Sequence, residues 1–269
     1  MRAFLRKLWT LLAVQYAYML EYRAEILLWA IATILPLLMM GPWMVAGASG
    51  RFPLSEAAFA RYFVAAFIVR QFSIVWVIWE FEYQVVSGRL SPLLLHPIDP
   101  IWRFVSSHLG EHLTRAPIVA AFAVVAVLLF PQAIHDEAGT IALPALLDVA
   151  KAFVAIYAAF AIRFLLQYSV ALGAFWVERV SAFDNLIMIP YLFLSGLVAP
   201  LEVFPPAVRE FALWTPFPYL VWFPARLLAG GEVDLGRAVL VIAGWIAVLH
   251  VVVRIVWRRG LRHYSAMGA

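Results

Sequence analysis

The chain contains no cysteine in its 269 residues, and charged residues make up only 13% of it. The lack of cysteine excludes disulfide bonds, thiolate metal sites and cysteine nucleophiles. Soluble domains contain about 25% charged and roughly 45–50% apolar residues, whereas 65% of this chain is hydrophobic. A single domain of this length could not bury so much apolar surface in water. The composition therefore predicts a membrane protein.

The chain also has few lysines, and it lacks the common motifs of nucleotide binding and of catalysis. The two lysines, Lys7 and Lys151, lie outside any GxxxxGK[ST] sequence, so the chain has no P-loop for ATP. The motifs HExxH, GxSxG, DFG and GxGxxG are missing too. His108 and His112 have the i,i+4 spacing of metal ligands, but without a third ligand at a fixed spacing we interpret them, with His96, as polar interface residues. We expect no catalytic residue, metal or cofactor in this chain, and any ATP dependence must come from a partner.

Long apolar runs predict six membrane-spanning helices, since each helix needs about 20 apolar residues to cross the hydrocarbon core. The fold class is therefore an all-α integral membrane protein. The fourth run is longer than a bilayer requires and must tilt or protrude. The fifth has only about fifteen apolar residues, which indicates a short span followed by re-entrant backbone. The predicted spans are residues 26–48, 59–86, 113–133, 143–177, 186–200 and 235–257.

Three further segments surround these spans. Residues 1–25 place apolar side chains opposite basic ones at helical spacing, which predicts an N-terminal amphipathic helix at the membrane interface. Residues 26–269 then form one transmembrane domain. Within this domain, prolines and a glycine in residues 87–112 predict a structured loop near the surface. Residues 201–234 are rich in proline and aromatic residues, and predict a re-entrant hairpin between spans five and six.

The distribution of basic residues predicts the orientation. With six spans, both termini lie on one side of the membrane, and that side holds twelve of the 20 lysines and arginines, against six on the other. Basic residues are in excess in cytoplasmic segments. We therefore expect both termini and the loop 87–112 in the cytoplasm, and the hairpin 201–234 outside. The basic balance of the chain is explained by topology, so we expect a lipid environment and no nucleic-acid partner.

Of the charged residues within the predicted spans, we expect four to lie inside the membrane, namely Arg70, Glu80, Glu82 and Arg163. A charge at the bilayer centre costs about 2.5–3.5 kcal/mol on insertion scales, so such residues usually find a partner or water. Glu80 and Arg163 lie at similar depths in their spans, because each follows the start of its span by about 20 residues at 1.5 Å per residue. They either pair with each other or extend separately to the cytoplasmic interface.

Three stretches resemble a known family. EYQVVSGRLSPLLLHPIDP at residues 82–100 has an acidic residue, a Ser-Gly-basic turn and then Leu-Leu-x-Pro. LFLSGLVAPLEVFPPAVREFALWTPFPYLVWFPARLLAGG at residues 192–231 has a Ser-Gly, Leu-Pro, Pro-aromatic and basic-Leu-Leu-x-Gly pattern, and GLRHYSAMGA ends the chain. The chain resembles the ABC-2 type permeases of prokaryotic ABC transporters, particularly the six-span subgroup with two different permeases and a separate ATPase. One departure is His96, where the subgroup more often has a basic residue.

The resemblance implies a permease subunit, not itself an enzyme, in an ATP-driven exporter of the prokaryotic inner membrane. Its partners would be two copies of an ABC ATPase, which bind ATP and Mg²⁺, and a second, non-identical ABC-2 permease. The resemblance also implies that the loop between spans two and three docks on the ATPase, and that the hairpin caps the translocation path. The corresponding coupling residues are Arg89, Leu90, Pro92, Leu94, Pro97, Ile98, Asp99, Pro100, Ile101 and Phe104. The cap residues are Ser195, Gly196, Pro200, Glu202, Pro205 and Pro206.

Two other functions are compatible with parts of the sequence. Charges within spans and broken helices also occur in secondary transporters, although the chain lacks the internal inverted repeat expected there. Glu80, Glu82 and the loop histidines weakly suggest a membrane-embedded enzyme acting on lipid, but a catalytic constellation is missing. For an exporter, the apolar and aromatic-rich composition favours an amphipathic or hydrophobic substrate.

Overall fold

The structure is a computed structural model that describes residues 2–135, 140–141 and 143–267. These residues form α-helices joined by short 3-10 turns, and their only β-type pairing is an isolated bridge between His135 and Ile141. The α-helices are α1 (Arg2–Glu21), α2 (Arg23–Ala32), α3 (Leu35–Ala48), α4 (Glu56–Ser73), α5 (Val77–Val86), α6 (Leu90–Leu94), α7 (Ile101–Leu129), α8 (Leu146–Ala171), α9 (Asp184–Leu194), α10 (Pro206–Ala212), α11 (Trp222–Leu228) and α12 (Leu235–Met267). The 3-10 turns are η1 (Pro131–Ile134), η2 (Leu172–Phe175), η3 (Val180–Phe183), η4 (Leu201–Val203) and η5 (Phe217–Leu220).

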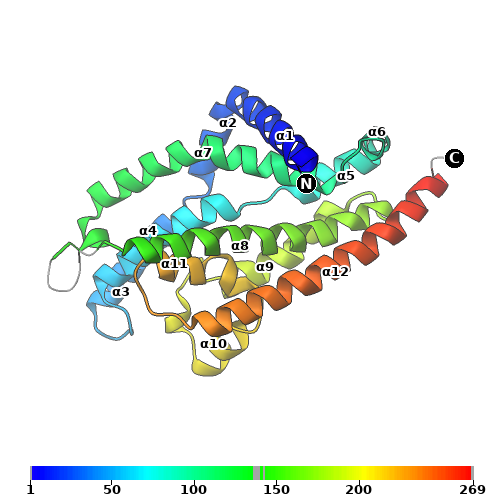
Figure 1. The fold of residues 1–269 in the computed structure, drawn as a ribbon. Coiled ribbons are helices and arrows are strands. Elements are labelled where there is room, and N and C mark those ends of the chain that lie inside the picture. Colours follow the sequence, from blue (N-terminus) through cyan, green and yellow to red (C-terminus); the bar gives the residue numbers. More distant parts are fainter. Residues whose placement is uncertain (1, 136–139, 142, 268–269) are drawn as a thin grey trace.

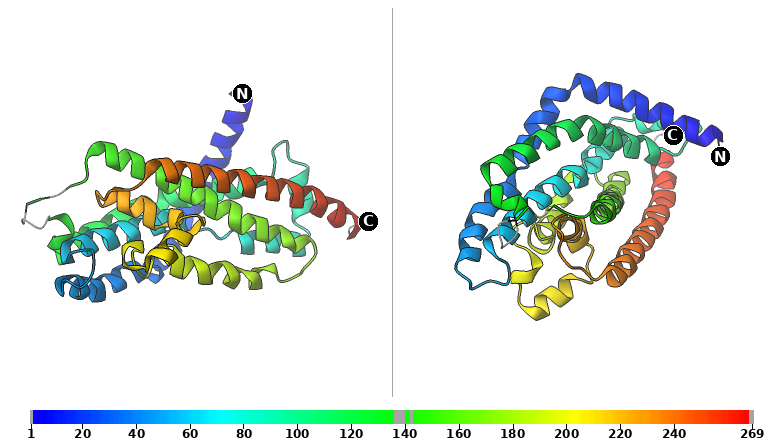
Figure 2. Two further views of the ribbon diagram at one scale, coloured as in Figure 1. Left: turned by 90° about the horizontal axis from the view of Figure 1, so that it is seen from below. Right: turned by 60° about the vertical axis from the view of Figure 1, so that its left-hand side comes forward.

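The helices form an elongated bundle around α8. Helix α8 contacts α4, α5, α11 and α12, and Figure 2 shows it near the middle of the bundle when the molecule is viewed toward one end. Helix α12 runs along one side to the C-terminus, while α1 packs along the first part of α7 (Figure 1). The N-terminal end of α1 and the C-terminal end of α12 both lie toward the end of the bundle that carries the short helix α6.

Five helical segments are long and apolar enough to cross a membrane, which confirms the all-α membrane class. A shorter apolar segment, Val180–Leu194, corresponds to the short fifth span predicted from the sequence. It begins and ends six residues earlier than predicted. The helix ends at Leu194 because the chain turns at Gly196, where φ is +85°. The five longer segments are Arg23–Ala48, Glu56–Val86, Ile101–Leu129, Leu146–Phe175 and Leu235–Tyr264.

The third span differs most from the prediction. Residues 101–112, expected in the loop, form the first three turns of α7, so the loop is confined to residues 87–100. Pro100 is the N-cap of α7, the Asp99 carboxylate accepts the Ile101 N–H, and no proline follows before Pro117. The polar residues Ser106, His108 and His112 of this segment are buried. The prolines and the glycine that predicted the loop end at Pro100, so they mark only residues 87–100 as a loop.

Helix α1 accounts for most of the predicted interfacial segment 1–25. Gly110 of α7 permits its close approach, since a Cβ at this position would lie 3.0 Å from the backbone of Gln15 and Tyr16. The location of α1 at the membrane interface stays a prediction. The last two residues of the C-terminal motif, Gly268 and Ala269, lie outside the described residues.

Candidate functional site

The loop between α5 and α7 has a buried side and an exposed side. Its short helix α6 follows a turn at Gly88, where φ is +73°. Leu90 and Leu93 face the protein, with exposed fractions of 0% and 9%. In contrast, Leu94 is 37% exposed and Leu95 is 86% exposed. The two buried leucines therefore anchor a loop whose other two leucines remain uncovered.

Polar contacts connect this loop to both ends of the chain. Oδ1 of Asp99 accepts a hydrogen bond from the Ile101 backbone N–H at 3.1 Å, and its Oδ2 pairs with Arg254 of α12 at 3.3 Å. The hydroxyls of Ser91 and Tyr264 lie 2.9 Å apart. In addition, Lys7 Nζ of α1 donates to the Pro97 carbonyl at 3.2 Å. Asp99 thus joins the start of α7 to α12, while the other two contacts attach the loop to α12 and α1.

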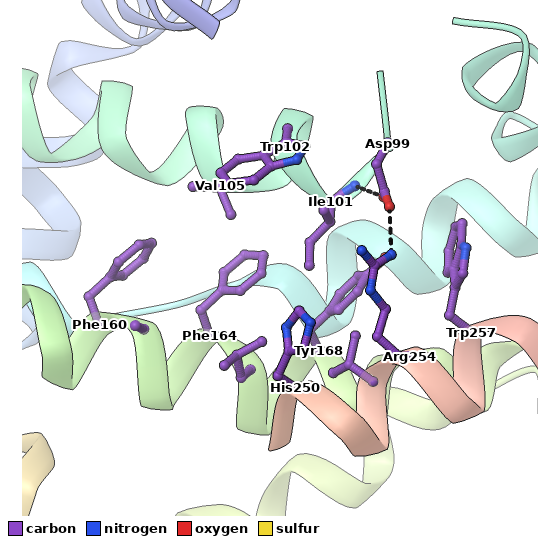
Figure 3. Close-up of a pocket in the computed structure, with 13 residues that line it drawn as sticks. Asp99, Ile101, Trp102, Val105, Phe160, Phe164, Tyr168, His250, Arg254 and Trp257 are labelled. Atoms are coloured by element: carbon purple, nitrogen blue, oxygen red, sulfur yellow. Dashed lines mark hydrogen bonds and ion pairs between the residues drawn. The ribbon is translucent and has the colours of Figure 1, made fainter. Parts of the chain in front are cut away.

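A cavity of about 260 Å³ lies between α7, α8 and α12, beside the Asp99–Arg254 pair. Figure 3 shows aromatic side chains on α7, α8 and α12 around it, with the ion pair at one end. A movement of Asp99 would therefore alter both the start of α7 and the cavity. The labelled lining residues are Asp99, Ile101, Trp102, Val105, Phe160, Phe164, Tyr168, His250, Arg254 and Trp257.

The predicted coupling residues occupy different surroundings. Arg89, Pro92, Leu94 and Pro97 are exposed, and the Arg89 guanidinium lies 5.1 Å from the centre of the Tyr83 ring. The half-buried members are Ile98, Asp99 and Ile101, and the buried ones are Leu90, Pro100 and Phe104. The sequence prediction omitted Leu95, whose side chain is the most exposed of the loop leucines. The sequence offered one sign of this exposed residue, because Leu95 directly follows Leu94 and lies beyond Leu90 and Leu93, which anchor α6.

The charges within the spans do not pair as one alternative predicted. No ion pair joins Glu80 and Arg163 anywhere in the described part of the chain. The Arg163 guanidinium instead lies 4.1 Å from the centre of the Tyr191 ring. The carboxylate of Glu82 accepts hydrogen bonds from the Ser181 backbone N–H at 2.6 Å and from its hydroxyl at 3.1 Å. Equal depth in two helices does not bring two side chains together when the helices turn those faces to different neighbours.

Sequence reasoning missed a charged residue in the third span. Arg115 is 1% exposed, pairs with Glu111 one turn earlier, and donates to the Gln71 carbonyl at 3.1 Å. His108 is buried in the same helix, and its Nε2 accepts the Trp76 backbone N–H at 2.9 Å where α4 and α5 are separated. Both residues supply hydrogen bonds to backbone groups that the broken second span leaves open. His108, which the sequence analysis predicted to be a polar interface residue, therefore lies in the interior.

The predicted hairpin is compact and internally bonded. Gly196 has a carbonyl that accepts the Tyr62 hydroxyl at 2.7 Å, and the buried Ser195 has a carbonyl that accepts the Trp222 N–H at 2.8 Å. Glu202 pairs with Arg226 at 2.9 Å and accepts the Trp222 indole N–H at 3.0 Å. Of the remaining cap residues, Pro200 precedes the turn η4, and Pro205 and Pro206 begin α10.

Five apolar helical segments of membrane-spanning length, found among the described residues, define a multi-pass membrane protein. The sequence profile of the ABC-2 family transporter proteins matches residues 27–268. The chain therefore belongs to the ABC-2 transporter family, which confirms the resemblance found in the sequence. Membership of this family implies a permease subunit of an ABC transporter. No curated protein sequence matches the chain.

Proposed function

We propose that the chain is the permease subunit of an ATP-driven exporter that moves an amphipathic or hydrophobic substrate out of a prokaryotic cell. Two copies of an ABC ATPase would bind ATP and Mg²⁺, and a second, non-identical ABC-2 permease would complete the translocation path. Both termini and the loop 87–100 would lie in the cytoplasm. The hairpin 201–234 would close the path on the opposite side.

The observation that carries this proposal is the uncovered leucine pair of the loop. An apolar side chain as exposed as Leu95, next to the exposed Leu94, is the kind of group that a partner protein covers at the centre of an interface. Leu90 and Leu93 hold the backbone of α6 against the bundle, so a partner would meet a shaped surface. The loop is short, which favours rigid transmission of a push from the partner.

The contacts of the loop supply a route for that push. A displaced loop pulls on α12 through Asp99 and Ser91, and on α1 through Pro97. Helices α7 and α12 also form two walls of the aromatic cavity. A movement at the loop would therefore change the packing between helices without any chemistry in this chain.

The charge distribution supports the proposed orientation. Lys7, Arg89, Arg258 and Arg259 are all exposed. Lys7 bonds to Pro97 of the loop, Arg89 is in the loop, and Arg258 and Arg259 are in the last part of α12, whose C-terminal end lies toward the loop end of the bundle (Figure 1). An excess of basic residues is typical of the cytoplasmic side. A reporter fused within the loop should therefore report cytoplasm, whereas one placed near Glu210 of the hairpin should report the outside.

Co-purification with the proposed ABC ATPase partner tests the proposal. Leu94→Asp and Leu95→Asp should each reduce the amount of ATPase recovered by at least tenfold, because a carboxylate at the centre of an apolar contact is desolvated without a partner. Ile141→Asp is the matched control, since Ile141 is 68% exposed in the connection at the opposite end of the bundle. Undiminished recovery with both leucine variants, at normal membrane insertion, would contradict the coupling role.

A further inference from the structure

Two arginines meet at one tyrosine inside the bundle. Arg163 lies slightly past the middle of the span Leu146–Phe175, and Arg70 near the middle of the span Glu56–Val86. Nη1 of Arg70 donates a hydrogen bond to the Tyr191 hydroxyl at 3.0 Å. The Arg163 guanidinium lies 4.1 Å from the centre of the same ring, and that of Arg70 5.8 Å from it. Two cations thus share one aromatic side chain at membrane depth.

These guanidinium groups have fewer acceptors than they need. Arg163 is 6% exposed, and its buried Nε and Nη1 have no hydrogen-bond partner, nor has the Nε of Arg70. No ion pair within 4.0 Å includes either arginine among the residues that the structure describes. Buried charges and buried N–H groups are strongly destabilising when nothing compensates them. An arrangement of this kind is retained in a membrane protein when it serves binding or transport.

The nearby charges do not balance. Asp184 and Arg70 are the charged groups that act on Arg163 electrostatically. Asp184 is buried, and its Oδ1 already accepts a hydrogen bond from Gln167 Nε2 at 2.8 Å. Two guanidinium groups and one carboxylate leave the cluster with one excess positive charge. A single negative charge with free oxygen lone pairs would supply both what the charge balance lacks and the acceptors that Arg163 lacks.

We propose that Arg70 and Arg163 bind the anionic headgroup of the exported substrate, which is therefore an amphipathic compound with one carboxylate or phosphodiester group. This inference rests on the proposed exporter function. Tyr191 occupies the place of the anion between the arginines in the absence of substrate, through its hydroxyl and the face of its ring. Arg70 is only half-buried, so it is the first of the two that an entering headgroup meets.

The depth of the cluster favours a transported molecule over a resident lipid. The headgroups of membrane lipids lie at the two interfaces, about 15 Å from the midplane of a hydrocarbon core about 30 Å thick. Arg70 and Arg163 lie near the middles of their spans, roughly 20 Å along the helix from the nearer end at 1.5 Å per residue. A resident phospholipid would have to draw its headgroup into the hydrocarbon region, whereas a substrate in transit must pass this level.

Binding of an anionic probe and its neutral ester tests the proposal on the full chain. The chain is reconstituted in nanodiscs of zwitterionic phosphatidylcholine, and the affinities of dansyl-undecanoic acid and of its methyl ester are measured by fluorescence against empty nanodiscs. The native chain should bind the acid at least about tenfold more tightly than the ester, the size that one charge-assisted hydrogen bond contributes. Arg163→Gln and Arg70→Gln should remove this preference, and Arg163→Lys should keep part of it.

Further variants separate binding from a purely structural role. Lys151→Gln is the control, because Lys151 is on the same helix as Arg163 but pairs with Asp148 in a partly exposed position. It should leave the preference for the acid unchanged. Tyr191→Phe keeps the ring and frees Nη1 of Arg70, so it should tighten binding of the acid severalfold and leave the ester unaffected. A role confined to folding would not tighten binding.

Several results would overturn the inference. The native chain could bind acid and ester with equal affinity. The preference for the acid could survive Arg163→Gln in a correctly folded protein, or Tyr191→Phe could fail to tighten binding of the acid. Loss of the preference when phosphatidylglycerol is added to the nanodiscs would show a resident anionic lipid at the site instead of a substrate. Failure of the exporter function is distinguishable, because it would appear as loss of ATPase association while the binding preference remains.

Discussion

The hairpin end and the loop end of the bundle contain similar residues but bury them to different extents. At the hairpin end, charged and aromatic groups bond to one another, as in the pair Glu202–Arg226 with side chains only 11% and 17% exposed. At the loop end, the pair Asp99–Arg254 is exposed by 32% and 54%, and two leucines beside it are uncovered. The hairpin end therefore buries its ion pair, whereas the loop end leaves its ion pair exposed beside two uncovered leucines.

This difference agrees with separate roles for the two ends, in which the hairpin closes the path and the loop receives force from a partner. A hairpin held by buried hydrogen bonds resists deformation, which suits a cap. The ion pair that joins the loop to α12 is exposed, and an exposed ion pair contributes only about 0–1 kcal/mol, so its loss costs little stability. Substitutions of the same kind at both ends should therefore have unequal effects on stability.

The largest expected difference concerns two glycines with positive φ. Gly196→Ala should destabilise the protein by about 2–5 kcal/mol, because the left-handed conformation is strained and the new Cβ meets Tyr62 and Trp222. Gly88→Ala should lower stability by only about 1–2 kcal/mol, since nothing lies within 4 Å of its Cβ position. Thermal unfolding in detergent measures both, and equal losses would remove the contrast between a packed hairpin and an open loop.

The ion pairs of the two ends give the next effect. Glu202→Gln should lower stability by about 1.5–3 kcal/mol, because Arg226 keeps a largely buried charge while losing its charged partner. Asp99→Asn, its counterpart at the loop, should lower it by less than about 1 kcal/mol. Chemical unfolding of the two variants provides the comparison. A larger loss for Asp99→Asn would mean that the loop contributes more rigidity than its exposure indicates.

The smallest effect is a pH dependence in the hairpin. Hydrogen bonds from Arg237 lower the pKa of Glu210 on α10. A carboxyl with a lowered folded pKa stabilises above its unfolded value of about 4.3, and this contribution is lost as pH falls through the folded value. Glu210→Gln should therefore slightly reduce hydrogen-exchange protection of α10 at neutral pH.

Acidification supplies the control for this prediction. The native protein and Glu210→Gln should become indistinguishable once Glu210 is protonated, and Glu232→Gln in the neighbouring exposed connection should leave α10 unchanged at every pH. A difference between native and Glu210→Gln protein that persists in acid would exclude the charged pair as its cause.

The membrane fold could be predicted because apolar runs reveal spans directly. The main error concerns residues 101–112, which the sequence analysis joined to the proline-rich loop although they form the first turns of α7. His108 and Arg115 look like surface residues in the sequence, yet they bond to the backbone of the broken second span. Such pairing depends on which helices become neighbours, and helical periodicity alone does not contain that information.

The candidate sites show the same limit. The sequence identified the loop and the hairpin through proline, glycine and family resemblance, but it did not distinguish exposed Leu95 from buried Leu93. It also placed Arg163 and Glu80 at similar depth and left open whether they pair, whereas in the structure Arg163 lies against the Tyr191 ring. Depth follows from counting residues, but the direction of a side chain depends on the packing of the whole bundle.

Site-specific photo-crosslinking compares the two ends most directly. Benzoylphenylalanine in place of Leu95, and separately in place of Phe211, puts the same reactive group on exposed apolar positions of the loop and of α10. With the proposed ABC ATPase partner co-expressed, the variant at Leu95 should form a covalent adduct with the ATPase, and the variant at Phe211 should not. An adduct from position 211, or none from position 95 in an intact complex, would contradict the assignment of the loop as the surface that receives the ATPase.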